Sequence, residues 1–84
     1  MTATHEIYAR LSGIFRDVFL DDDLTISAET SAKDIEGWDS LAHVTLMVNV
    51  ERAFGIRFRS SEIAALQNVG ELARLIESRM REKG

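Results

Sequence analysis

GWDSLAHVTLMVNVERAFG, residues 37–55, contains a polar start, an apolar run and a closing glycine. Leu46, Val50 and Phe54 recur every fourth position in it, which is the spacing of one face of a helix. The closing glycine suits the left-handed conformation in which many helices end. We therefore expect a helix over residues 40–54 that packs into a small bundle.

The start of this helix carries an aspartate followed by a serine. Asp39 and Ser40 can each cap the helix, because both side chains accept a hydrogen bond from its first turn. The unpaired N–H groups and the dipole of a helix N-terminus also favour a negative group, such as a phosphate on the oxygen of Ser40. These residues alone leave a capping serine and a modified serine both open.

The same helix is apolar on a second side. Leu41, Val44 and Val48 are spaced i, i+3, i+7 and are rotated away from the first stripe. A domain of this size can hardly cover a helix all round, so the pattern predicts a docking face left in water. The alternative is that the helix is central and better buried than we expect.

Upstream, the apolar spacing predicts a helix over residues 4–19. Residues 20–38 are rich in Asp, Ser and Thr and lack periodicity, so we expect a long loop there. The apolar residues that can pin this loop to the core are Leu24, Ile26, Ile35 and Trp38.

Downstream, a short extended link leads to a brief helix expected over residues 62–66 and capped by Ser60 or Ser61. Asn68 with Glu71 is a capping signal for a final amphipathic helix. The apolar face of that helix comprises Val69, Leu72, Ala73, Ile76 and Met80. The predicted fold class is all-α: one domain over residues 1–84, with three long helices, one short helix and a long first loop.

Composition narrows the class of protein. The chain has 84 residues, 45% of them hydrophobic and 29% charged, as in an ordinary soluble domain. It has no bilayer-length apolar run and no signal-peptide start, so we expect a cytoplasmic protein without membrane contact. Residues 1–39 hold three basic and nine acidic side chains, which argues against a nucleic-acid partner. The absence of cysteine excludes disulfides and cysteine nucleophiles.

The sequence shows no convincing pattern for a catalytic or a metal site. Ser40 and His43 would be neighbours on one helical turn, and the G-x-S-x-G pattern of a hydrolase nucleophile is absent. The acidic loop from Asp21 departs from a calcium loop at Ile26, where glycine is required. His5 and His43 have no partner at ligand spacing. We therefore predict no catalytic residue and no metal.

Over residues 5–80 the chain closely resembles the acyl carrier proteins. The resemblance is carried by GWDSL, the apolar helix after it, ERAFGIRF, the short capped helix and the final helix. The resemblance implies a four-helix bundle in which a phosphodiester joins Ser40 to 4′-phosphopantetheine, donated from coenzyme A by a phosphopantetheinyl transferase. It implies that the thiol of this arm holds acyl groups as thioesters. Such a carrier is no enzyme and delivers its cargo to acyl-loading and acyl-processing enzymes; we expect a monomer.

The resemblance also assigns the two stripes. The positions that match the partner-binding surface are Asp39, Leu41, Val44, Val48 and Glu51. The positions that match the inner core, where some carriers shelter an acyl chain, are Leu46, Val50, Phe58, Ile63, Leu66 and Leu72. Phe54 also matches this core.

Some residues depart from the fatty-acid carriers. Ala42, Thr45, Arg52 and Ala53 stand where acidic residues are common, and Arg57 and Arg59 add positive charge. Because charges select partners, we expect a specialised pathway, such as polyketide, modified-lipid or hydroxyacyl assembly. The bulky residues around the core predict little room for a long acyl chain.

Two aromatic residues near Ser40 remain. We expect His43 to be an exposed helix histidine, and Trp38 to be either a hydrophobic staple or a mark of carriers in secondary pathways. The alternative functions are a peptidyl or aminoacyl carrier and an unmodified helical interaction module.

Overall fold

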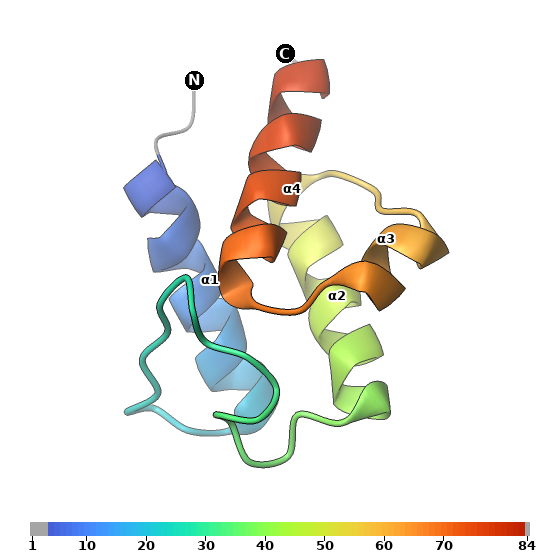
Figure 1. Cartoon of the computed structure of the whole chain (residues 1–84). Helices are drawn as coiled ribbons and strands as arrows, with labels where there is room; N and C mark the ends of the chain where they lie inside the picture. The colour runs from blue at the N-terminus through green and yellow to red at the C-terminus, as the bar shows by residue number, and fades with distance from the viewer. Residues whose placement is uncertain (1–3, 84) are drawn as a thin grey trace.

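Four helices and a long loop form the computed structural model, which describes residues 4–83 (Figure 1). The helices are α1 (Thr4–Phe19), α2 (Ser40–Phe54), α3 (Ser60–Ala65) and α4 (Val69–Lys83). No strand occurs in this described part, and the predicted all-α class is confirmed. The ranges expected for the first two long helices agree with the structure. Residues 1–3 and 84, which the predicted single domain includes, lie outside the described residues.

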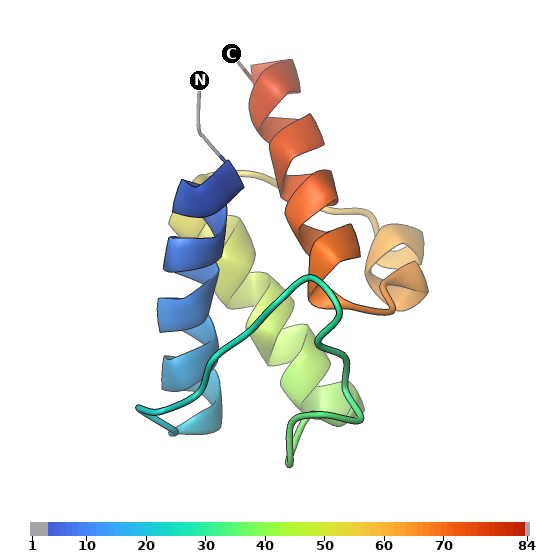
Figure 2. The same ribbon diagram turned by 60° about the vertical axis from the view of Figure 1, so that its left-hand side comes forward.

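The three long helices share one core. α1 packs against both α2 and α4, while α3 lies to the side, near α2 and α4 (Figures 1 and 2). Burying one large aliphatic or aromatic side chain stabilises a fold by roughly 1.5–3 kcal/mol, so this cluster dominates the stability. The fully buried large side chains are Ile7, Leu11, Phe15, Leu46, Met47, Val50, Val69, Leu72 and Ile76.

The C-terminal end of α2 is closed from two directions. Gly55 adopts the left-handed conformation (φ 65°), and the N–H groups of Gly55 and Ile56 both donate to the carbonyl of Glu51. Arg10 of α1 donates to the carbonyl of Ala53, and its guanidinium lies 4.3 Å from the centroid of the Phe54 ring. The predicted helix end is therefore confirmed, and α1 reinforces it.

The long loop is fixed to the bundle. Of the four residues expected to pin it, Ile35 is buried, and the other three are half-buried against the core. The loop also satisfies the start of α4: the N–H groups of Val69 and Gly70 donate to the carbonyls of Thr30 and Ala28, each at 2.9 Å. Figure 2 shows the loop rising to this helix end. The loop thus pairs N–H groups that a helix N-terminus normally leaves without partners.

The short helix differs from its prediction. α3 covers residues 60–65 and not 62–66, and neither predicted serine caps it. Arg59 occupies the capping position, and the carboxylate of Glu62 accepts from the backbone N–H of Arg59 at 2.8 Å. The start of α3 is therefore set by a glutamate inside the helix, which reaches back toward the chain that enters it.

The predicted cap of α4 is confirmed. The side-chain oxygen of Asn68 accepts from the N–H of Glu71 at 2.9 Å. The carboxylate of Glu71 in turn accepts from the N–H of Gln67 at 2.9 Å, one residue before the position expected in a capping box.

Candidate functional site

Ser40 is the first residue of α2 and is exposed. Asp39, and not Ser40, caps the helix: its carboxylate accepts from the N–H of Ala42 at 2.9 Å. The hydroxyl of Ser40 makes no hydrogen bond to another described residue. Of the two capping residues that the sequence allows, the structure selects the aspartate and leaves the serine hydroxyl available for chemistry.

A negative group on the oxygen of Ser40 would lie at the positive end of the α2 dipole. Asp39 directs its carboxylate to Ala42, and its carbonyl accepts from the N–H of His43 at 2.9 Å. The N–H groups of Ser40 and Leu41 make no hydrogen bond within residues 4–83, so two donors of the first turn remain for an anion. The helix start therefore fits a phosphodiester on this serine.

The second apolar stripe of α2 is exposed, as expected. The exposed fractions of Leu41, Val44 and Val48 are 77%, 56% and 39%. They decrease from the serine end of the helix toward its C-terminal end. The apolar surface is therefore largest immediately beside Ser40.

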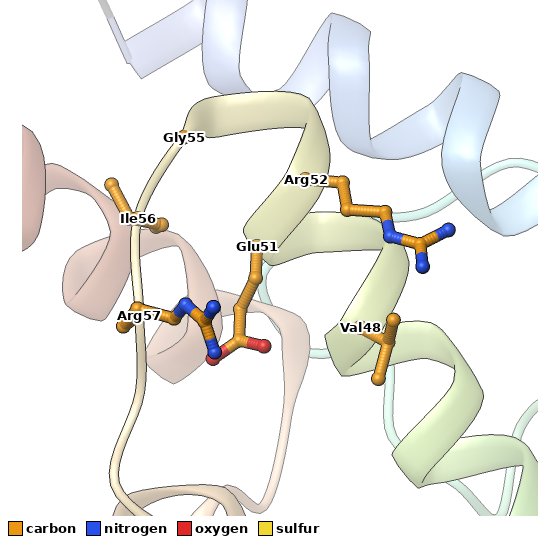
Figure 3. Close-up of a pocket in the computed structure, with 6 residues that line it drawn as sticks. All are labelled: Val48, Glu51, Arg52, Gly55, Ile56 and Arg57. Atoms are coloured by element: carbon orange, nitrogen blue, oxygen red, sulfur yellow. The ribbon is translucent and has the colours of Figure 1, made fainter.

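A shallow hollow continues this stripe past its last valine (Figure 3). Its lining residues are Val48, Glu51, Arg52, Gly55, Ile56 and Arg57. The side chains of Glu51 and Arg57 extend into the hollow, and the side chain of Arg52 extends in another direction.

Both carboxylates assigned to the partner surface also hold the fold in place. Glu51 accepts from the backbone N–H of Phe58 at 2.7 Å and so ties the link before α3 to α2. Asp39 is engaged as the cap of α2. Arg52 and Arg57 are exposed, and neither forms an ion pair among the described residues. At the C-terminal end of α2, Arg52 and Arg57 outnumber the one carboxylate of Glu51, so the net charge around the hollow is positive.

The prediction that His43 is exposed is wrong. Its ring is half-buried, stacks on Trp38 with 6.0 Å between ring centroids, and accepts from the indole N–H at Nδ1 (3.0 Å). The other ring nitrogen, Nε2, lies 3.0 Å from the carbonyl oxygen of Ile63 in α3. The indole also packs edge-on against Phe15, at 5.4 Å between centroids, and against Phe19. Trp38 is therefore a hydrophobic staple, which is one of the two roles predicted for it.

The sequence contains a signal for this pair. With Asp39 as the cap, Trp38 and His43 occupy the two positions that a hydrophobic staple joins across a helix start. The expectation of an exposed histidine used only its place one turn after Ser40. The contact with Ile63 depends on the placement of α3, which the local sequence does not give.

The six candidate acyl-pocket residues divide into two groups. Leu46 and Val50 have no exposed surface, and Leu72 is 2% exposed. The remaining candidates, Phe58, Ile63 and Leu66, are half-buried and pack against the core. Phe58 lies in the link before α3, Ile63 lies in α3 and Leu66 follows it directly, so the three line one side of a closed core.

An ion pair that the sequence analysis missed attaches α3 to α4. Glu62 accepts from the guanidinium of Arg79, which also donates to the carbonyl of Arg57. The backbone N–H of Arg59 and the guanidinium of Arg79 together hold the pKa of the Glu62 carboxyl below its ordinary value of 4.5. The carboxylate of Glu62 in turn raises the pKa of Arg79. A 17-residue separation in sequence hides this pair from any local pattern.

Among residues 4–83, no group of three or more histidine, aspartate and glutamate side chains is placed to hold a metal ion. None of the described helices is both long enough and apolar enough to cross a membrane.

Comparisons with known proteins agree with this geometry. A family model described as "Phosphopantetheine attachment site" matches residues 9–76, a range that includes Ser40. The solution structure of a holo acyl carrier protein from Geobacter metallireducens is 43% identical and superposes with a TM-score of 0.85, covering 92% of this chain and 88% of that chain.

Two matches come from Thermotoga maritima. A curated acyl carrier protein is 25% identical over 80 residues, which are 95% of this chain and 99% of the relative. The crystal structure of an acyl carrier protein is 22% identical with a TM-score of 0.85 over 96% and 94% of the two chains, which shows the same fold. With an attachment-site model over most of its length, the protein belongs to the acyl carrier protein family and is a carrier of acyl groups on 4′-phosphopantetheine rather than an enzyme.

Proposed function

We propose that Ser40 is the residue to which 4′-phosphopantetheine is attached. The observation that carries this proposal is the exposed serine hydroxyl, unbonded among the described residues, at the start of a helix that another side chain already caps. When bound, the group supplies a thiol that holds an acyl chain as a thioester. A chain without cysteine has no such thiol of its own.

The residues around Ser40 have separate tasks in this function. Asp39 fixes the first turn of α2, so that Ser40 is exposed on a capped helix end. The backbone N–H groups of Ser40 and Leu41 favour the negative charge of a phosphodiester at this point. No side chain of the carrier has to move a proton, because the transferase that modifies the serine supplies that chemistry.

Members of this family interact with phosphopantetheinyl transferases and with acyl-processing enzymes. The surface that we propose for these contacts starts at Asp39, follows the exposed stripe of Leu41, Val44 and Val48, and ends at Glu51. The stripe supports the proposal because a monomer gains nothing by leaving such residues in water beside its attachment site.

Partner choice follows from the charge of that surface. Arg52 and Arg57 face solvent without an ion pair among the described residues, while the carboxylates of Asp39 and Glu51 are hydrogen-bonded to backbone N–H groups and keep their negative charge. Enzymes whose docking surface carries acidic groups opposite these arginines are favoured, because charges steer encounter and exclude wrong partners. This preference supports a specialised pathway of polyketide, modified-lipid or hydroxyacyl type. The cytoplasmic location and the monomeric state stay predictions.

Cargo length is open to test on the carrier itself. Leu46 and Val50 have no exposed surface and Leu72 is only 2% exposed, so a long acyl chain would have to push these three side chains away from Ile63 and Leu66 to enter. We expect a short acyl chain on the arm to perturb the NMR signals of these core residues, and a long chain to perturb mainly the signals at the surface of α2. Equal burial of short and long chains would contradict this expectation.

The experiment that tests the attachment site is an intact-mass measurement. The protein is incubated with coenzyme A, magnesium and a broad-specificity phosphopantetheinyl transferase, and Ser40→Ala is run beside it. We expect wild type to gain one phosphopantetheine and the variant to gain none. A gain on both proteins would move the site away from Ser40. No gain on the folded wild type, repeated with the transferase from its own source, would refute the proposal.

A further inference from the structure

Three segments that are separate in sequence meet at the imidazole of His43. Trp38 precedes Ser40 in the loop, His43 lies one turn after Ser40 in α2, and Ile63 belongs to α3. The indole N–H lies 3.0 Å from Nδ1, and Nε2 lies 3.0 Å from the carbonyl oxygen of Ile63. The ring is half-buried, and its two nitrogens are both occupied.

The partners fix the protonation pattern of the ring. An indole N–H can only donate, so Nδ1 must accept and carries no proton. A backbone carbonyl can only accept, so Nε2 must carry the proton and donate. His43 is therefore a neutral imidazole in one defined tautomer. The other tautomer would set the N–H of Nδ1 against the indole N–H, and a ring turned over would present carbon atoms to both partners.

The hydrogen bond between His43 and Ile63 matters because α3 has few other contacts with the bundle. No residue of α3 is buried, so packing alone holds the helix weakly. Two polar contacts join it to the rest of the bundle: the bond from His43 to Ile63 in its second half and the ion pair between Glu62 and Arg79 near its start. The histidine contact is the one that connects α3 to the region of Ser40.

We propose that His43 is a positioning residue that locks the loop before Ser40 and the helix α3 to α2, so that enzymes meet the serine and α3 as one pre-organised surface. The proposal rests on Ser40 being the attachment site. A surface that is already ordered loses less conformational entropy on docking, which strengthens binding without any new contact. His43 itself touches neither the serine oxygen nor a ligand in this role.

Two substitutions each keep one hydrogen bond of the His43 ring and remove the other. In His43→Asn the side-chain oxygen falls near the place of Nδ1, so the bond from Trp38 is kept and the bond to Ile63 is lost. In His43→Gln the amide nitrogen reaches the place of Nε2, so the bond to Ile63 is kept and the bond from Trp38 is lost. His43→Ala removes both bonds, and His5→Asn, on the exposed surface of α1, is the matched control.

The first measurement uses the carrier alone. Nitrogen-15 NMR of wild type should show an unprotonated Nδ1 and a protonated Nε2 in His43. Amide hydrogen exchange in α3 should accelerate about fivefold in His43→Asn, the effect expected from one lost hydrogen bond, and stay near wild type in His43→Gln and His5→Asn. A proton on Nδ1 in the wild-type ring, or unchanged exchange in both His43→Asn and His43→Ala, would overturn the proposal.

The second measurement is the rate of phosphopantetheinyl transfer to Ser40. With both bonds lost in His43→Ala, KM should rise by roughly fivefold or more while kcat changes little, because the chemistry is untouched and only the docked surface is less ordered. Unchanged KM in a variant whose α3 exchanges faster would overturn the docking role. If wild type is never modified, the attachment site itself fails, and the exchange data still decide whether His43 holds α3.

Discussion

At the start of α2, one side chain caps the helix and the next one is left for modification. Asp39 satisfies the helix, and Ser40 is left exposed without an intramolecular hydrogen bond among the described residues. A modified serine that also served as the cap would have to break a stabilising contact each time it was modified. Separating the two tasks lets the helix start stay unchanged whether or not the hydroxyl carries a group.

This division predicts unequal effects on stability. Asp39→Ala should lower the free energy of unfolding by about 1 kcal/mol, the usual effect of losing an N-cap. Ser40→Ala should change it by no more than about 0.5 kcal/mol, as for an exposed residue without partners. Urea unfolding followed by circular dichroism measures both values. A larger loss in the serine variant would show that Ser40 caps the helix after all.

At the scale of elements, the junction between the loop and α4 leaves little room for a side chain at Gly70. A Cβ added there would lie 3.0 Å from the carbonyl oxygen of Ala28, which is the acceptor for the N–H of Gly70 itself. Backbone cannot move aside as a flexible side chain can. The glycine is thus required by the close approach of two segments.

Alanine at two glycines should therefore have opposite effects. Gly70→Ala should destabilise the fold by about 1–3 kcal/mol, because the added methyl overpacks the junction. Gly13→Ala, inside α1 with no atom within 4 Å of the new Cβ, should stabilise it by about 0.5–1 kcal/mol. Thermal unfolding of the two variants beside wild type makes the comparison. If Gly70→Ala also stabilised the fold, the loop backbone near Ala28 would have to move to accept the added methyl group.

The attachment of α3 to α4 should depend on pH. The folded protein holds the pKa of Glu62 below 4.5, so the contact contributes stability above pH 4.5 and loses it as pH falls through the lowered pKa. We expect the protection of the α3 amides, corrected for the intrinsic pH dependence of exchange, to fall below about pH 4.5. Glu62→Gln, which cannot ionise, should show lower protection at neutral pH and a smaller loss of protection in acid. An identical pH profile for both proteins would contradict this assignment.

Local patterns predicted all three long helices because periodicity and caps lie within each segment. They failed at α3, where Glu62 and not a serine determines the helix start. They also missed the ring of His43, since its second partner is Ile63, 20 residues away. Contacts between separate elements depend on how the bundle closes, and the spacing of residues in one helix does not contain that information.

At the scale of the whole molecule, α2 serves two surfaces at once. Its inner stripe enters the shared core, and its outer stripe stays in water next to Ser40. The first surface determines whether the chain folds, and the second is available for docking. Both stripes were predicted from spacing alone. The spacing did not show that the carboxylates of Asp39 and Glu51 accept hydrogen bonds from the backbone.

Matched truncations on the two sides of α2 test this separation. Phe54 is 4% exposed, so Phe54→Ala should lower the free energy of unfolding by about 3–5 kcal/mol. Val44 is 56% exposed, so Val44→Ala should change it by less than about 0.5 kcal/mol. Chemical denaturation gives both numbers under one set of conditions. Similar losses in the two variants would mean that the inner and outer faces are misassigned.

The staple at the start of α2 also gives the molecule an optical reporter. Trp38 is the only tryptophan of the chain and lies two residues before Ser40. Its indole touches two phenylalanine rings of α1 and the imidazole of α2. Tryptophan emission, excited selectively over Tyr8, therefore arises from a single ring where the loop, α1 and α2 meet. Loading of the carrier and its capture by an enzyme can be followed by light emission in real time, without attaching a dye.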